Sequence, residues 1–136
     1  MSWSDYITNL MDVKCEDAAI VGFNPPCLWA SRPGGFLEKI TPEEIKVFVL
    51  PDRSNLFVKG VTLGGMKCSV IRDEFDTPDV HCMDLKTKNP DGPKLNVTVA
   101  KTNTALIIVV AADGIHGSHC NSKAHSLCVY LRKQNF

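Results

Sequence analysis

The fold is decided by residues 95–112, which read LNVTVAKTNTALIIVVAA. Two apolar, β-branched segments, Leu95–Lys101 and Thr104–Ala111, lie on either side of Thr102-Asn103. A connection this short joins its two strands as an antiparallel hairpin. The apolar run Ala105–Ala112 has the length of a strand and is far below the roughly 20 residues that span a bilayer. These residues therefore predict the centre of an antiparallel sheet.

The strand pattern continues toward the N-terminus of this hairpin. Strands are predicted at Ala18–Phe23, Leu28–Ser31, Leu56–Lys59, Val61–Leu63, Lys67–Phe75 and His81–Lys86. Most of the separators in the second half of the chain are short and rich in glycine, proline, asparagine and aspartate, as in Gly64-Gly65. Such separators favour hairpins, so the second half of the chain is expected to form a meander of neighbouring strands.

Three helices are expected around these strands. The first covers residues 2–12 and has an apolar stripe of Trp3, Tyr6, Ile7, Leu10 and Met11. A short second helix begins after Thr41, with Pro42 in its first position and Glu44 completing a capping box. The last helix runs from about Asn121 to Lys133, with a stripe of Ala124, Leu127, Cys128 and Leu131. This order of elements predicts an α+β fold with the terminal helices packed on one antiparallel sheet.

Length and composition narrow the class of protein. The 136 residues predict a single domain, 1–136, and 15 basic residues balance 15 acidic ones. A net charge of zero argues against charge-driven nucleic-acid binding. The start of the chain has no basic segment followed by an apolar one, so no signal peptide is expected. None of the six cysteines forms a C-x-x-C pair, which favours free, mostly buried thiols in a reducing compartment.

Catalytic and metal chemistry find little support in the sequence. His116, His119, Cys120 and His125 are clustered, but they lack the paired spacing of a zinc site and lie beside a glycine-rich turn, so no metal is predicted. Cys120 and His116 carry no catalytic signature around them. The stretch Gly60–Lys67 lacks the lysine-hydroxyl ending of a phosphate-binding loop and is better explained as a hairpin turn. We expect no catalytic residue and no cofactor, and an enzyme is the least supported class.

The aromatic residues suggest a binding surface. Trp3 and Tyr6 lie one turn apart on the first helix, Trp29 is on the following hairpin, and Tyr130 and Phe136 are near the end of the chain. These rings could simply fill the core, although other residues of the two helices could do that. If the terminal helices lie side by side, the rings would form a groove. Such rings stack on proline, and tryptophan and tyrosine donate hydrogen bonds to the exposed carbonyls of a proline-rich ligand.

The whole chain resembles the profilin family in its vertebrate-type form. Matching segments run from end to end in the same order: Trp3-x-x-Tyr6-Ile7, Asp17–Gly22, Val61–Asp73 with one open position, Met83–Lys88 with one open position, Gly114–Gly117 and Tyr130–Arg132. The resemblance implies a central antiparallel sheet with the N- and C-terminal helices side by side on one face and a short helix on the other. It also implies a monomeric cytosolic protein of the cytoskeleton that binds monomeric actin and speeds exchange of its bound nucleotide.

The family also binds proline-rich segments of actin-assembly factors such as formins. By this resemblance the polyproline-binding residues would be Trp3, Tyr6, Trp29, Tyr130, Leu131 and Phe136. Tyr130 stands where many relatives have histidine, and Phe136 stands where many have tyrosine. Both positions keep a ring, but Phe136 loses a hydroxyl donor, so ligand preference is expected to differ.

The resemblance further implies an actin-binding face and a phosphoinositide-binding set. The actin face would comprise Phe57, Val58, Lys67, Ser69, Val70, Ile71, Arg72, Lys86, Lys88, Asn96, Ile115, His116, Gly117 and Asn121. The candidate head-group contacts are Lys67, Arg72, Lys86, Lys88, Arg132 and Lys133. Departures from the usual pattern at Val80, Ser118, Ser122, His125 and Ser126 predict weaker actin binding, since a lost interfacial charge or ring costs affinity. The alternative function is a module for proline-rich ligands that has largely lost actin.

Overall fold

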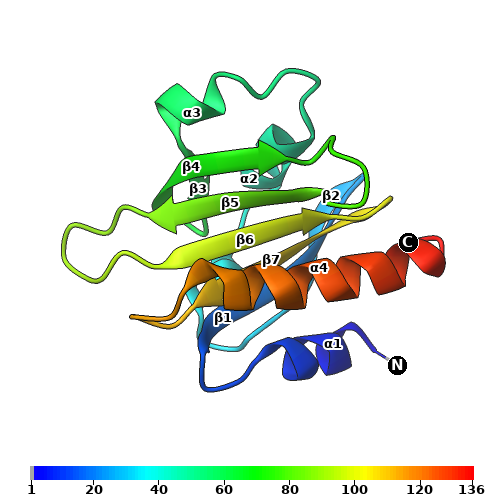
Figure 1. Cartoon of the computed structure of the whole chain (residues 1–136), viewed down its shortest axis with the longest axis horizontal. Helices are drawn as coiled ribbons and strands as arrows, with labels where there is room; N and C mark the ends of the chain where they lie inside the picture. Colours follow the sequence, from blue (N-terminus) through cyan, green and yellow to red (C-terminus); the bar gives the residue numbers. More distant parts are fainter. Residues whose placement is uncertain (1) are drawn as a thin grey trace.

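Seven antiparallel strands form one sheet in the computed structural model, which describes residues 2–136 (Figure 1). Their order across the sheet is β2-β1-β7-β6-β5-β4-β3. The strands are β1 (Cys15–Phe23), β2 (Pro26–Ser31), β3 (Val61–Leu63), β4 (Met66–Glu74), β5 (Cys82–Thr87), β6 (Asn96–Lys101) and β7 (Ala105–Ala111). From β3 to β7 each strand pairs with the next one along the chain, so the predicted meander is confirmed.

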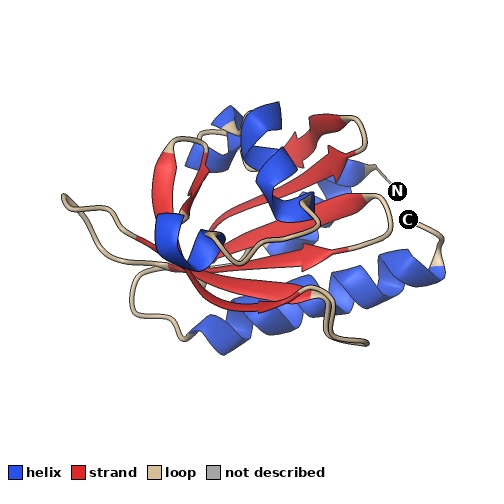
Figure 2. Cartoon of the chain, turned by 90° about the horizontal axis from the view of Figure 1, so that it is seen from above, coloured by secondary structure: helices blue, strands red, loops and turns tan. Residues whose placement is uncertain are grey.

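The helices cover both faces of this sheet. The long helix α4 (Gly117–Lys133) and the N-terminal helix α1 (Trp3–Leu10) lie side by side on one face (Figure 1). The other face carries the short elements η1 (Phe36–Lys39), α2 (Pro42–Lys46) and η2 (Val47–Val49), as Figure 2 shows from above. The expected arrangement of terminal helices and short helix is confirmed. Among residues 2–136, none of the helices combines the length and apolar character that a membrane span requires.

The two faces of the sheet carry two separate hydrophobic cores. All seven residues of β7 are buried, and they alternate between the cores. Leu106, Ile108 and Val110 pack beneath the short helices. Ala105, Ile107, Val109 and Ala111 pack beneath α1 and α4. Because both faces of β7 are covered, the strand reads as a continuous apolar run instead of alternating with polar residues.

One predicted strand is wrong. Leu56–Lys59 forms the helix α3, in which the amides of Lys59 and Gly60 donate to the carbonyls of Asn55 and Leu56 at 2.9 Å. A four-residue apolar run does not distinguish a strand from a helical turn by its pattern. Helix α4 also begins one turn earlier than predicted, because His116 serves as its N-cap and its imidazole accepts a hydrogen bond from the Ser118 amide.

The cysteines follow the expectation from composition. All six are free, and five of them are buried. Burial raises the pKa of the Cys68, Cys82 and Cys120 thiols to about 12. Cys27, on the edge strand β2, is exposed.

Glu44 joins the short helix α2 to the β3–β4 hairpin. The predicted capping box is confirmed, with the Thr41 amide donating to Glu44 Oε1 at 2.9 Å. The same carboxylate accepts hydrogen bonds of 3.0 Å from the Gly64 and Gly65 amides. Both glycines have positive φ, as a type I′ turn requires, and a Cβ on Gly64 would collide with the Phe36 carbonyl. The glycine-rich stretch is therefore a tight hairpin turn, as predicted.

Replacing Glu44 by alanine is expected to lower the free energy of unfolding by about 2 kcal/mol, because three backbone donors lose a charged acceptor. Burial opposes ionisation of Glu44, but hydrogen bonds from Gly64–Gly65 and Thr41 outweigh it and lower the pKa of its carboxyl. The stabilisation is therefore present above the pKa of the Glu44 carboxyl in the unfolded chain, about 4.3, and is lost as pH falls through the lower pKa of the folded protein. Urea unfolding at pH 7 and at pH 3.5 measures both effects. The exposed neighbour variant Glu43→Ala serves as the control, and an equal loss in both variants would contradict the role of Glu44.

Candidate functional site

The two terminal helices bring the predicted aromatic residues onto one surface. The Trp3 ring centroid lies 4.7 Å from that of Trp29, 5.5 Å from Tyr6 and 5.3 Å from Phe136. Tyr6 lies 6.4 Å from Tyr130, across the junction of α1 and α4. We call these five residues the aromatic surface. A cavity of about 610 Å³ between α1 and α4 continues from Tyr6 and Tyr130 toward His119.

A bulge in the edge strand aims Trp29 at this surface. In β1 and β2, Val21 pairs with Leu28 and Ile20 pairs with Ala30, so Trp29 is the extra residue of a β-bulge. Its indole therefore lies on the same face of the sheet as α1. The indole also packs directly on Gly22, where an added Cβ would come within 2.5 Å of Trp29 Nε1.

The aromatic surface presents polar tips as well as rings. Tyr130 is 49% exposed, whereas Tyr6 and Trp3 are partly buried. Burial, together with the neighbouring Tyr130, raises the pKa of Tyr6, so the Tyr6 hydroxyl keeps its proton at neutral pH. The Phe136 backbone is fixed by hydrogen bonds with Thr104 and Leu131 of 3.1 and 2.9 Å. The surface thus combines flat apolar area with hydroxyl donors.

Leu131 does not lie on this surface. Its side chain is only 1% exposed and belongs to the core beneath α4. Leu131 lies four positions after Leu127 and one after Tyr130, and helical geometry turns it toward the sheet. Leu131 therefore supports the rings from below, and its contact with a proline-rich ligand stays a prediction.

Seven of the fourteen residues predicted for the actin face line a hollow between the sheet and the start of α4. The hollow has a volume of about 490 Å³ and is lined by Ile71, Arg72, Lys86, Asn96, His116, Gly117 and Asn121, among others. Ile71 is the extra residue of a second β-bulge, between Val70 and Arg72, and is exposed. Ser69 is directly opposite Lys86 in the β4–β5 ladder. The side-chain amide of Asn96 donates a hydrogen bond to the Ile115 carbonyl at 3.2 Å.

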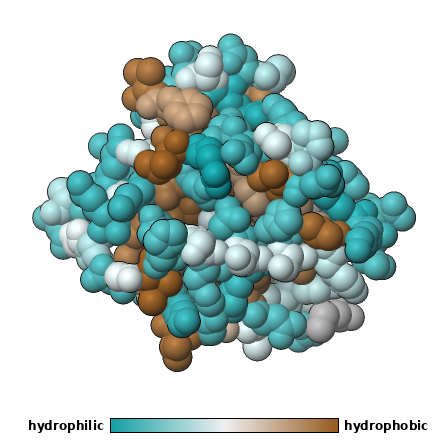
Figure 3. All heavy atoms as spheres, in the orientation of Figure 1, coloured by the Kyte–Doolittle hydropathy of each residue, from teal (hydrophilic) through white to brown (hydrophobic). Residues whose placement is uncertain are grey.

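The remaining predicted residues of this face extend it beyond β4. Phe57 and Val58 are exposed on α3, and Figure 3 shows hydrophobic atoms at the surface over this helix. Lys67 and Lys88 line a neighbouring hollow of about 520 Å³, where the Lys88 amide donates to the Lys67 carbonyl at 2.8 Å. Val70 differs from these residues because it is 7% exposed and packs in the core on the side of α2; its contact with a partner stays a prediction.

Sequence reasoning missed Asp84, which organises the second face. Its Oδ2 accepts from Arg72 Nη2 at 2.8 Å and Nε at 3.1 Å. Its Oδ1 accepts from Asn121 Nδ2 at 3.1 Å and from Thr98 Oγ1 at 3.3 Å. The carboxylate therefore holds one side chain of β4 and one of α4 in fixed positions. The only signal in the sequence was a lone acidic residue inside an apolar strand.

Two of the unusual residues have defined contacts in the structure. Ser118 Oγ lies 2.9 Å from His116 Nδ1, and the Ser118 amide donates to the same nitrogen at 3.1 Å. Serine at this position thereby orients the imidazole at the rim of the hollow. His125 Nε2 lies 2.7 Å from the Asp79 carbonyl oxygen. Ser122 is exposed and lines both the 490 Å³ hollow and the cavity beside the aromatic surface.

The six cations predicted to contact head groups do not form one patch. Lys67, Arg72, Lys86 and Lys88 lie on β4 and around the end of β5, beside the two hollows. Arg132 and Lys133 are in the last turn of α4. The Arg132 guanidinium donates to the Lys101 carbonyl from Nη2 at 2.6 Å and from Nε at 3.1 Å, so it fastens α4 to the sheet.

The cluster of histidines near residue 120 separates in space. His116 contacts Ser118, and His125 contacts the backbone of Asp79. His119 instead turns toward Asp12, with 3.1 Å between Nε2 and Oδ2. The three histidines therefore point to different places and do not share a site.

Comparisons with known proteins agree with this architecture. A family model described as Profilin matches residues 1–136. The chain is 45% identical to human Profilin-1 and 43% identical to rat Profilin-2, over 98% of each chain in both cases. The structure of mouse Profilin IIa in complex with a double repeat from the FH1 domain of mDia1 superposes with a TM-score of 0.95, at 41% identity and with full coverage of both chains.

The packing of Trp29 on Gly22 predicts the effect of a single methyl group. Gly22→Ala is expected to displace the indole from the aromatic surface and to lower the free energy of unfolding by about 1–3 kcal/mol. Tryptophan fluorescence and urea unfolding measure the two effects. Gly92→Ala is the matched control, because a Cβ there meets only the flexible Asn89 side chain. An unchanged emission spectrum in Gly22→Ala would contradict the packing described here.

Proposed function

The chain belongs to the profilin family, and we propose that it binds monomeric actin, promotes nucleotide exchange on actin and binds proline-rich segments of actin-assembly factors. The observation that carries the proposal is the separation of two surfaces on one rigid sheet. The aromatic surface lies at the joined ends of the chain, and the face around Asp84 lies on β4–β6 and the start of α4. Such a protein would act at the cytoskeleton as an adaptor that holds two partners together.

The aromatic surface is suited to a proline-rich strand of the polyproline II type. Such a ligand has flat pyrrolidine faces and exposed carbonyls, because its backbone makes no internal hydrogen bonds. The rings of Trp3, Trp29 and Phe136 offer stacking area, while Tyr6 and Tyr130 carry hydroxyl donors. A relative of known structure holds an FH1 repeat of mDia1, which supports a formin as the natural ligand.

The face around Asp84 has the composition of a protein interface. Exposed apolar side chains, Phe57, Val58 and Ile71, lie among flanking lysines and arginine. Promotion of nucleotide exchange requires no covalent chemistry by this chain, because binding an open actin state more tightly than a closed one shifts actin toward opening. The protein would act as a binding protein rather than as an enzyme. Ser122, Ser126 and His125, where relatives carry charges or a ring, favour weaker actin binding.

We propose that phosphoinositide head groups bind only to the cations on or beside the sheet, Lys67, Arg72, Lys86 and Lys88. Arg72 and Lys86 line the hollow that actin would cover, so head group and actin would exclude each other. Arg132 is excluded from the set because its guanidinium is engaged by the Lys101 carbonyl and by Asn103.

Trp3→Ala is expected to weaken binding of a proline decamer by about 2 kcal/mol or more, roughly 30-fold, because Trp3 contacts three of the four other rings. Actin affinity should stay within about twofold, since Trp3 lies on α1, away from the hollow. Intrinsic fluorescence of Trp29 or calorimetry measures the first affinity, and fluorescence titration of labelled monomeric actin measures the second. Equal loss of both affinities would contradict two separate surfaces.

Asp84→Ala should produce the reverse pattern. Without the carboxylate, Arg72 and Asn121 lose their common acceptor, and actin affinity is expected to fall by about tenfold. Proline-decamer binding should not change. Glu16→Ala, an exposed acidic residue on β1, controls for the change in net charge. Normal actin affinity in Asp84→Ala would show that another part of the surface binds actin.

A further inference from the structure

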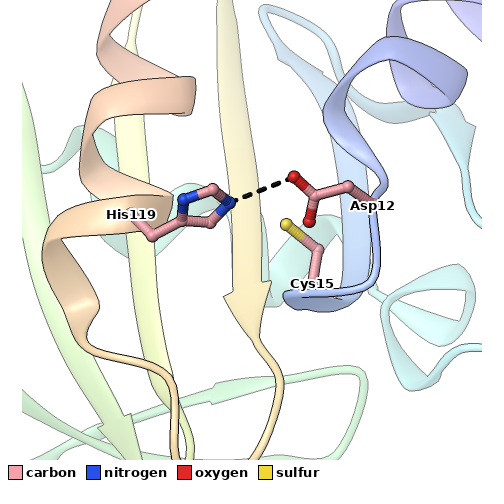
Figure 4. A group of neighbouring side chains, drawn as sticks. All are labelled: Asp12, Cys15 and His119. Carbon is pink, nitrogen blue, oxygen red and sulfur yellow. Dashed lines mark hydrogen bonds and ion pairs between the residues drawn. The ribbon is translucent and has the colours of Figure 1, made fainter.

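Three potential metal ligands meet where the end of α1 approaches the start of α4 (Figure 4). Asp12 follows α1, Cys15 begins β1 and His119 is in the first turn of α4. One ligand atom from each side chain lies within 4.8 Å of the other two. We propose that Asp12, Cys15 and His119 bind a zinc ion. Spacing within residues 116–125 predicted no metal, but the structure draws two of the three ligands from the other end of the chain.

The donor atoms are those that zinc prefers. A thiolate, an imidazole nitrogen and a carboxylate oxygen form a set that is too soft for Ca²⁺ or Mg²⁺ and typical of Zn²⁺. Three protein ligands with a fourth position filled by water or another donor is a common zinc arrangement. Figure 4 shows the imidazole, the carboxylate and the thiol pointing toward one another. The two other histidines of this region contact other groups and are not part of the set.

The present distances need little adjustment to reach zinc geometry. Nitrogen and oxygen ligands about 2.0–2.1 Å from zinc, and sulfur about 2.3 Å from it, lie about 3.3–3.6 Å apart in a tetrahedron. The distance between His119 Nε2 and Asp12 Oδ2 is already 3.1 Å. A metal ion would take the place of the hydrogen bond between them, and Cys15 Sγ, which lies within 4.8 Å of both atoms, would move closer by at most about 1.3 Å.

The backbone around these ligands is held in place independently of any metal. The Lys14 amide donates to Asp12 Oδ1 at 2.8 Å, and the Cys15 amide donates to the Asp12 carbonyl at 3.1 Å. Cys15 itself is paired with Ala111 in the sheet. Asp12 Oδ2, the oxygen that faces His119, is on the opposite side of the carboxylate from the bond to Lys14. A preorganised site of this kind loses little conformational entropy on binding.

Cys120 lies next to the proposed site and is not one of its three ligands. It follows His119 on α4 and is buried. Burial is the main cause that raises the pKa of the Cys120 thiol to about 12, and the neighbouring Cys15 thiol contributes to the rise. A thiol that resists ionisation in this way is not suited to nucleophilic chemistry.

The ammonium group of Lys123 opposes a cation here. Its Nζ lies 2.8 Å from Asp12 Oδ2. It also donates to the Leu10 carbonyl at 2.8 Å and to the Asn9 carbonyl at 3.4 Å, so it keeps two acceptors when the metal takes the carboxylate. Binding releases the Cys15 proton to solvent, because zinc binds the thiolate.

The test uses the full-length chain, reduced with a phosphine that does not bind zinc, and titrated with Co²⁺ and then Zn²⁺. Cobalt should bind at one equivalent with visible bands of tetrahedral geometry and a near-ultraviolet band of thiolate-to-cobalt charge transfer. Zinc should then displace it and raise the midpoint of thermal unfolding. His119→Ala, a change at a partly exposed position, should lower the affinity by about tenfold or more and remove the tetrahedral bands.

Matched variants separate this site from adventitious binding. His125→Ala removes another histidine of the same helix, and Cys27→Ser removes the exposed cysteine; both should bind cobalt as the parent chain does. Cys15→Ser should abolish the charge-transfer band in a chain whose circular dichroism is unchanged, and Asp12→Asn should weaken binding without removing that band. No charge-transfer band in the parent chain, or one that survives in His119→Ala and disappears in His125→Ala, would overturn the proposal.

Discussion

The burial of β7 on both faces is the constraint on which the rest of the structure depends. Every residue of Ala105–Ala111 is inaccessible to solvent, so each side chain had to suit one of two cores. On the face of α1 and α4 the sheet contributes several small residues to the core. Helix α4 packs Cys120, Ala124 and Cys128 against them. Small side chains let the long helix lie close to the sheet. That close packing brings the two ends of the chain together, and with them the aromatic surface.

Two β-bulges give the sheet its binding character. A regular strand alternates its side chains, so adjacent residues cannot face the same way. The extra residue in each bulge breaks this rule, and places Trp29 beside Ala30 and Ile71 beside Arg72 on the face of the terminal helices. Each of the two surfaces thus has a side chain that regular pairing would have turned toward the other core.

Much of the fold could be predicted because it depends on local signals. A few consecutive residues are enough to predict the capping box at Thr41, the glycine turn of the hairpin and the apolar strands. The run at Leu56 failed because four residues fit a strand or a helical turn equally well. Asp84 and the Asp12–His119 contact could not be found in this way, since their partners are separated from them by 12 to 107 positions. Burial of Leu131 and Val70 likewise depends on which way a helix or strand is turned when it docks.

The cysteines differ in burial, so a thiol reagent can label the protein selectively. Five thiols are buried in the cores. Burial raises the pKa of Cys68, Cys82 and Cys120 to about 12, so these three side chains are almost entirely unreactive thiols at neutral pH. Cys27 is the accessible thiol among the residues that the structure describes, and it is two positions from Trp29. A maleimide dye would thus attach at a single known point on the native protein, beside the indole, without any engineered cysteine. The wild-type chain carries its own attachment point for a fluorescent reporter.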